Sequence, residues 1–181
     1  MKKGLFVSIL VLSVGGFFAS SGVADDTLVE FKGGIGVIPV SSAAGTQNAD
    51  GTFPNVNRNV VRGVNPPGQI WRIDDLKAKV KSDGSITVNG RGLLLAGGNN
   101  IGTNAGASVF ATLICEATAP FTLRNTALVG VPLQADGDFQ INDVLAPPPP
   151  AACASPVLLI RNAANQAWFA AGILKSDESG D

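Results

Sequence analysis

The clearest structural pattern in the chain is Leu76-Lys77-Ala78-Lys79-Val80-Lys81-Ser82-Asp83-Gly84-Ser85-Ile86-Thr87-Val88-Asn89. Apolar and polar residues alternate on both sides of its Ser-Asp-Gly segment, which is the pattern of a β-hairpin with one buried face. A three-residue loop at Ser82, Asp83 and Gly84, with the glycine in the left-handed conformation, pairs Val80 with Ile86 and keeps the apolar residues together. A two-residue loop would instead mix the two faces. The sequence therefore predicts an antiparallel hairpin with the three-residue loop.

The same register extends outward along both predicted strands. From the loop outward it pairs Lys79 with Thr87, Ala78 with Val88, Lys77 with Asn89 and Asp75 with Arg91. The last pair has opposite charges and is expected to form a cross-strand ion pair. Upstream, Trp71 and Ile73 have the opposite parity to Leu76. We expect a β-bulge at Asp74-Asp75 to return both side chains to the core face.

A second hairpin is predicted around Ala135-Asp136-Gly137, which repeats the Asp-Gly turn of the first. A three-residue loop there pairs Leu133 with Phe139 and Val131 with Ile141, so that four apolar side chains share one face.

Period-two alternation and short apolar runs dominate the rest of the chain, while helical periodicity is nearly absent. In a first strand, Val29, Phe31, Ile35 and Val37 share one parity and are expected on one face. Further strands are expected at 108–117, 121–128, 156–162 and 167–175. The chain thus predicts an all-β, single-domain antiparallel β-sandwich of about eight strands, with a closed β-barrel as the alternative.

The chain begins with the three regions of a secretory signal peptide. Lys2 and Lys3 are a basic region, 5–18 is an apolar run, and Gly22-Val23-Ala24 supplies the small residues of a cleavage site. We expect residues 1–24 to be removed on export to the periplasm or the cell exterior. Residues 25–175 would then form the β-domain, and 176–181 a polar C-terminal tail.

Composition excludes several classes of function. The chain has no His, which rules out Ser-His-Asp and Cys-His nucleophiles and His-ligated zinc or copper. The chain has 13 Lys and Arg residues and 14 Asp and Glu residues. Removal of Lys2 and Lys3 with the signal peptide would leave the mature chain with a net negative charge. Nucleic acid or anionic lipid needs clustered positive charge, so neither is an expected partner. No cofactor is expected, and no integral membrane segment after cleavage.

Cys115 and Cys153 are the only two cysteines. An even pair in an oxidising compartment typically forms a disulfide, with two buried free thiols as the alternative.

The long segment 41–69, rich in Asn, Gly and Pro, is a candidate partner site for a glycan or a protein. Within and beside it, Arg58, Arg62 and Trp71, together with Asn55, Asn57 and Asn65, could form a hydrogen-bonding and stacking surface. The competing interpretation is a solvated loop with Trp71 in the core, and we favour it.

Two groups of carboxylates also need an interpretation. Asp136, Asp138, Asn142 and Asp143 could suggest calcium, but they lack the EF-hand spacing and are better explained by turn chemistry, so no metal site is expected. Glu30 and Glu116 are the candidates for a glycosidase-type pair, which needs two carboxyls about 5–10 Å apart.

Several segments together resemble a loose group of exported bacterial β-proteins of unknown function. The segments that carry the resemblance are 89–95, 111–115, 136–139, 153–157 and 168–170. The resemblance covers roughly Leu76 to Lys175 and its motifs are structural. It supports the β-fold and the disulfide and implies no activity.

These observations favour an exported, non-catalytic β-domain with a structural or binding role. One alternative is a β-barrel carrier of a small apolar ligand, in which the segment 168–172 would line the cavity. The other is a glycan hydrolase that uses carboxylates only.

Overall fold

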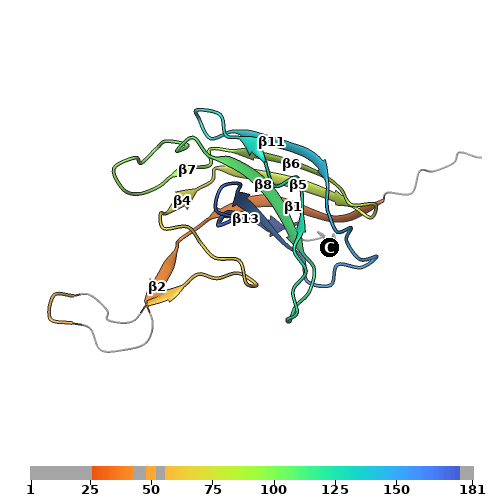
Figure 1. Ribbon diagram of the computed structural model, residues 1–181, viewed down its shortest axis with the longest axis horizontal. Coiled ribbons are helices and arrows are strands. Elements are labelled where there is room, and N and C mark those ends of the chain that lie inside the picture. Colours follow the sequence, from red (N-terminus) through yellow and green to blue (C-terminus); the bar gives the residue numbers. More distant parts are fainter. Residues whose placement is uncertain (1–25, 43–47, 52–55, 176–181) are drawn as a thin grey trace, which may run out of the picture.

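The computed structural model describes residues 26–42, 48–51 and 56–175. The expected signal peptide at 1–24 and the expected polar tail at 176–181 lie outside these residues. Within the described part, regular structure consists of β-strands (Figure 1). The strands are β1 (Thr27–Gly36), β2 (Val40–Ser42), β3 (Val56–Arg58), β4 (Trp71–Arg72), β5 (Asp75–Lys81), β6 (Ser85–Arg91), β7 (Leu94–Leu95), β8 (Ser108–Ile114), β9 (Arg124–Asn125), β10 (Val131–Pro132), β11 (Phe139–Val144), β12 (Val157–Asn162) and β13 (Trp168–Leu174).

Eight of these strands form one antiparallel sheet in the order β10-β8-β12-β13-β1-β5-β6-β11, and β9 pairs with β8 beside this path. The sheet curls until it nearly closes into a barrel. The predicted all-β antiparallel class is therefore confirmed, and both the sandwich and the barrel form of the prediction fit this curled sheet. Two short two-stranded sheets, β2–β3 and β4–β7, lie outside it.

The hairpin predicted at 76–89 is confirmed residue by residue. Val80 pairs with Ile86, and Asp75 pairs with Arg91 at the outer end. The loop comprises Ser82, Asp83 and Gly84, and the glycine has a φ of 90°. Arg91 Nη2 lies 3.1 Å from a carboxylate oxygen of Asp75, which is the expected ion pair.

The arrangement at Asp74-Asp75 matches the expected bulge. The Asp74 N–H donates to the carbonyl of Arg91, the residue that also pairs with Asp75, so two consecutive residues oppose one. Upstream of this point the chain leaves β5, and Trp71 pairs with Leu95 in the β4–β7 sheet. Trp71 is buried, but it lies in this separate sheet and stacks on Phe169, and it does not continue β5 on the core face as expected.

The second hairpin forms its turn but not its predicted strand pairing. The Gln134 N–H donates to Asp138, which closes the three-residue loop. The predicted pairs Leu133–Phe139 and Val131–Ile141 are wrong, because β10 pairs with β8 whereas β11 pairs with β6. Gln134 and Asp138 are a hydrogen-bonded pair, so the next hydrogen-bonded pair would need an N–H from Pro132, which has none. The turn instead spans the seam of the barrel, between the two edge strands of the sheet.

The first strand also departs from the prediction at one side chain. Val29, Phe31 and Val37 are buried, but Ile35 is 58% exposed. The β1–β13 register shifts between Phe31 and Gly34, and the intervening Gly33 has a φ of 96°. This bulge reverses the parity of β1 after Gly33, so the expectation that Ile35 shares the core face of Val29 and Phe31 was wrong; Val37 lies beyond the end of β1, where it packs into the core.

Three of the four further strands lie within their expected ranges, as β8, β12 and β13. The fourth, expected at 121–128, is reduced to β9. β8 and β12 are buried on both faces, as their apolar sequences indicate. The fully buried interior includes Leu76, Val80, Leu93, Leu113, Leu158 and Ile160.

The segment 59–70 covers part of the barrel wall and joins it to the β2–β3 hairpin, which projects from the barrel as an arm (Figure 1). The indole N–H of Trp168 donates to the Asn59 carbonyl at 2.9 Å, and the Trp168 backbone N–H donates to Asn65 at 3.0 Å. Val64 of this segment is buried in the same core. The arm is thus held against the barrel at its base.

The hairpin register predicts the effect of changing Gly84. Replacement by Val should lower the free energy of unfolding by about 1 kcal/mol or more, because a β-branched residue fits poorly at positive φ. Gly68→Val is the control, because a side chain at Gly68 meets open space and its φ is not positive. Urea unfolding of both variants measures the difference, and equal stabilities would contradict the loop assignment.

Candidate functional site

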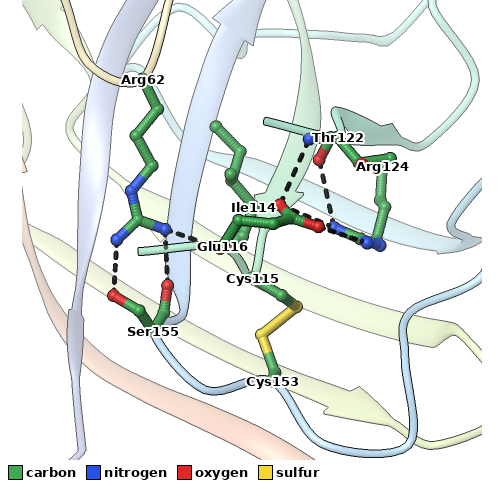
Figure 2. Close-up of a disulfide and its surroundings, with 8 residues drawn as sticks. All are labelled: Arg62, Ile114, Cys115, Glu116, Thr122, Arg124, Cys153 and Ser155. Carbon is green, nitrogen blue, oxygen red and sulfur yellow. Dashed lines mark hydrogen bonds and ion pairs between the residues drawn. A yellow bond between two sulfur atoms is a disulfide. The ribbon is translucent and has the colours of Figure 1, made fainter. Parts of the chain in front are cut away.

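The disulfide predicted between the only two cysteines is present. Cys115 follows β8 directly, and Cys153 precedes β12 (Figure 2). Their sulfur atoms are bonded at 2.06 Å, and their Cα atoms are 4.7 Å apart. The Ser155 N–H donates to the Cys115 carbonyl at 3.0 Å, so backbone pairing continues beside the bond. The bridge fixes the end of one buried strand to the entrance of its neighbour in the sheet.

Arg62, one of the three predicted binding residues, reaches this same place from the segment 59–70 (Figure 2). Its Nη1 donates to the Ile114 carbonyl at 3.2 Å and to the Ser155 carbonyl at 2.5 Å. Its Nη2 donates to Ser155 Oγ at 2.6 Å. The guanidinium therefore ties the segment to both strands next to the disulfide, and these bonds occupy it within the protein.

Glu116, one member of the candidate carboxylate pair, lies beside the disulfide and binds Arg124 (Figure 2). Arg124 donates through Nη2 to Oε1 at 2.7 Å and through Nη1 to Oε2 at 3.3 Å, and the Thr122 N–H also donates to Oε2. The hydrogen bonds from Arg124 are the main cause that lowers the pKa of Glu116 to about 2. A carboxyl with this pKa is ionised at neutral pH and holds no proton for general acid catalysis.

Glu30, the other member, lies on the outer face of β1. Its Oε2 is 2.6 Å from Lys175 Nζ, and its Oε1 is 3.6 Å from Lys79 Nζ. The hydrogen bond and the charge of Lys175 lower the pKa of Glu30. Neither glutamate therefore has the raised pKa that a glycosidase acid needs.

The structure does not bring the three predicted binding residues together. Trp71 is buried and stacks on Phe169 with ring centroids 3.9 Å apart, which is the core position that the sequence favoured. Arg58 lies at the base of the arm, where its Nη2 donates to the Pro66 carbonyl at 2.9 Å. Arg62 is held at the disulfide. Asn55 lies outside the described residues.

An apolar groove at the base of the arm was missed by the sequence analysis. We call it the arm groove; its volume is about 560 Å³, and it is lined by Ile38, Pro39, Val40, Arg58, Pro67, Gly68, Gln69 and Ile70. Ile38, Val40 and Ile70 are exposed there. The sequence signal for the groove is Ile38-Pro39-Val40, in which two large aliphatic residues flank a proline just before the Asn-, Gly- and Pro-rich segment. The groove therefore belongs to the same region as the predicted 41–69 partner site.

The acidic residues considered for calcium bind backbone amides. Asp138 Oδ1 accepts from the Gly92 N–H at 3.0 Å, and Asp136 Oδ1 accepts from the Asp138 N–H. Asp143 accepts from the N–H groups of Ala127 and Val144. Among the residues that the structure describes, no group of three or more His, Cys, Asp or Glu side chains is placed to hold a metal ion.

The described residues contain no helix of the length and hydrophobicity needed to cross a membrane. The chain matches no family model, no curated protein and no solved structure.

We predict that the disulfide makes a large contribution to stability. Its loop of 38 residues gives about 4 kcal/mol in the chain-entropy treatment, so a Cys115→Ser/Cys153→Ser variant should unfold at much lower urea concentration. Thiol labelling of the denatured, unreduced protein should detect no free thiol, and two after reduction. Two labelled thiols before reduction would contradict the bridge.

We also predict that the Glu116–Arg124 pair makes stability depend on pH. Glu116→Gln should cost about 2 kcal/mol at neutral pH, because it removes a charged acceptor from an Arg side chain that is nearly buried. The folded-state pKa of Glu116 is about 2, below its ordinary 4.5, so its contribution is complete above pH 4.5 and is lost as the pH falls toward 2.

The difference in the free energy of unfolding between wild type and Glu116→Gln should therefore decrease to near zero as the pH falls from 4.5 to 2, as measured by urea titrations. Glu30→Gln serves as the control. The ion pairs of Glu30 are more exposed, so the difference in the free energy of unfolding between wild type and this variant should be smaller. A Glu116→Gln gap that stays constant down to pH 2 would contradict this assignment.

Proposed function

We propose that this protein is an exported, non-catalytic β-barrel domain that binds an extended segment of another exported protein in the arm groove. The observation that carries this proposal is the cluster of exposed aliphatic side chains at the base of the arm. Single exposed aliphatic residues are ordinary on protein surfaces, whereas several gathered in one groove mark an interaction site. The signal-like sequence at 1–24 and the disulfide support export.

The neighbouring strands favour a polypeptide as the occupant. β2 and β3 pair only with each other within the described residues, so each has one edge that does not pair with a third strand. Such an edge can add a strand from a partner through backbone hydrogen bonds. Val40 belongs to β2 and also lines the groove, so a peptide added here would place its side chains beside the aliphatic cluster.

Packing of the barrel interior favours this proposal over a carrier of apolar ligands. Large aliphatic side chains from the strands fill the interior and have no exposed surface, including Leu76, Leu113, Leu158 and Ile160. The segment 168–172, which would line a cavity in a carrier, contributes buried Trp168 and Phe169 to the core. Binding on the outer surface therefore agrees better with the packing than binding inside.

The non-catalytic part of the proposal is supported by the acid–base groups. The chain has no His, and the two glutamates considered for glycan hydrolysis both have lowered pKa values. An acid with a pKa near neutrality is what such chemistry requires at neutral pH.

Site-specific photo-crosslinking in the exporting cells tests the proposal. A photoreactive residue placed at Ile38 should give one discrete polypeptide adduct. The same residue at Ile101 should give none, since that site is equally exposed (64% against 63%) but lies outside the groove. The adduct from a probe at Ile70 should disappear when Ile38→Asp is added.

Ile38→Asp should leave the free energy of unfolding within about 0.5 kcal/mol of wild type, because the side chain is exposed. Adducts of equal yield from Ile38 and Ile101, or none from either groove position, would overturn the proposal. An adduct that consists of glycan would support the glycan alternative in its place.

A further inference from the structure

Arg58 is the only charged side chain among the described residues that line the arm groove. It lies on β3 directly opposite Val40 of β2, so the charge and part of the aliphatic cluster share one face of the arm. Side chains that pair in this way have Cβ atoms about 5 Å apart. A ligand in the groove can therefore contact an exposed aliphatic surface and a guanidinium at the same time.

Arg58 differs from the other arginines in how little its guanidinium is bound within the protein. The structure describes every arginine of the chain. Those that pair with a carboxylate are Arg72, Arg91 and Arg124. Arg62 and Arg161 lack a carboxylate partner, but each donates three hydrogen bonds to protein acceptors. Within the described part of the chain, Arg58 has no ion pair and donates one hydrogen bond, from Nη2 to the Pro66 carbonyl.

The single hydrogen bond also holds the guanidinium at the groove. Pro66 directly precedes the lining residues 67–70, so the bond places Arg58 between the arm and this wall of the groove. Most of its five N–H donors remain available to a ligand, and the planar fork of a guanidinium matches the two oxygens of a carboxylate. The other lining residues carry no charge and cannot neutralise it. The groove therefore favours an occupant with a carboxylate.

We propose that the arm groove selects a polypeptide segment with an acidic side chain that binds Arg58. This inference rests on the proposed function and adds the chemistry of the partner. In an extended segment, side chains two positions apart lie on the same face, about 7 Å from each other. An Asp or Glu two positions from a Val, Ile or Leu therefore brings a carboxylate to Arg58 while the aliphatic side chain packs on Ile38, Val40 and Ile70.

Two synthetic peptides that differ in one functional group test this selection. In acetyl-Thr-Leu-Thr-Asp-Thr-amide the carboxylate is two positions from the leucine, and in acetyl-Thr-Leu-Thr-Asn-Thr-amide an uncharged amide replaces it. NMR titration of the isotope-labelled full-length protein, followed at the backbone amides of Val40 and Ile70, gives both dissociation constants. At low salt the Asp peptide should bind about fivefold more tightly, the upper range for an exposed ion pair. In about 1 M salt, where the Debye length is about 3 Å, the affinities should agree within about twofold.

Three variants assign the preference to Arg58. Arg58→Gln should abolish it, so that both peptides bind within about twofold of the affinity of the Asn peptide for wild type. Arg58→Lys keeps the charge but loses the planar fork, and should retain a preference of about twofold. Arg91→Gln is the matched control, because it removes the same charge from an exposed arginine outside the groove and should keep the fivefold preference. In every variant, the affinity of the Asn peptide reports whether the groove itself is intact.

Equal affinities of the two peptides for wild type, or a preference that survives Arg58→Gln, would overturn selection by Arg58 and leave the groove as a binding site. Absence of binding by both peptides would also overturn it, whereas the crosslink from Ile38 decides the proposed function separately. A third peptide, acetyl-Thr-Thr-Thr-Leu with a free C-terminal carboxylate, tests a chain end as the occupant. Tighter binding of this peptide than of the Asp peptide would overturn the assignment to an acidic side chain.

Discussion

The two edges of one curled sheet nearly meet in this protein, and this closure separates a filled interior from the outer surface. The two edge strands, β10 and β11, are joined by one tight turn, so the strands between them must curl to bring these edges together. The turn between Gln134 and Asp138 joins the two edges, and the carboxylate of Asp138 accepts from the N–H of Gly92, which follows β6. Closure encloses a filled apolar interior and leaves the outer wall and the β2–β3 arm as the surfaces for recognition.

Local patterns predicted those parts of the fold that short-range rules determine. The register of the 76–89 hairpin could be predicted from the alternation of apolar and polar residues, because a shift of one residue in the strand pairing would turn the apolar side chains to solvent. The second hairpin shows where this reasoning ends: its turn formed as predicted, yet Pro132 could not extend the ladder, and distant strands took up the pairing. Likewise, Ile35 changed face because a bulge at Gly33 altered the parity of β1, and bulges leave little trace in alternation.

The candidate sites were less predictable, because they depend on side chains that are far apart in sequence. Residue type suggested that Arg62 and Trp71 could serve binding, but the fold uses the first to secure the disulfide region and the second to fill the core. The carboxylate of Glu116 could be identified as a candidate, whereas Arg124, which determines its ionisation, could not. The basic outer face of β5 was visible in its alternating lysines, but the ion pair between Glu30 and Lys175, which follows β13, was not.

The manner in which the arm is attached has a mechanical consequence. At one root, the Val37 N–H bonds to Phe169; at the other, Asn59 accepts from the Trp168 indole. A few residues further along the chain, Arg62 donates hydrogen bonds to the carbonyls of Ile114 and Ser155, next to the two cysteines that form the disulfide. A force applied to the arm is therefore transmitted to two adjacent residues of β13 and, through Arg62, to the two strands that the disulfide links. The force is distributed over several strands of the barrel and does not act on one strand alone.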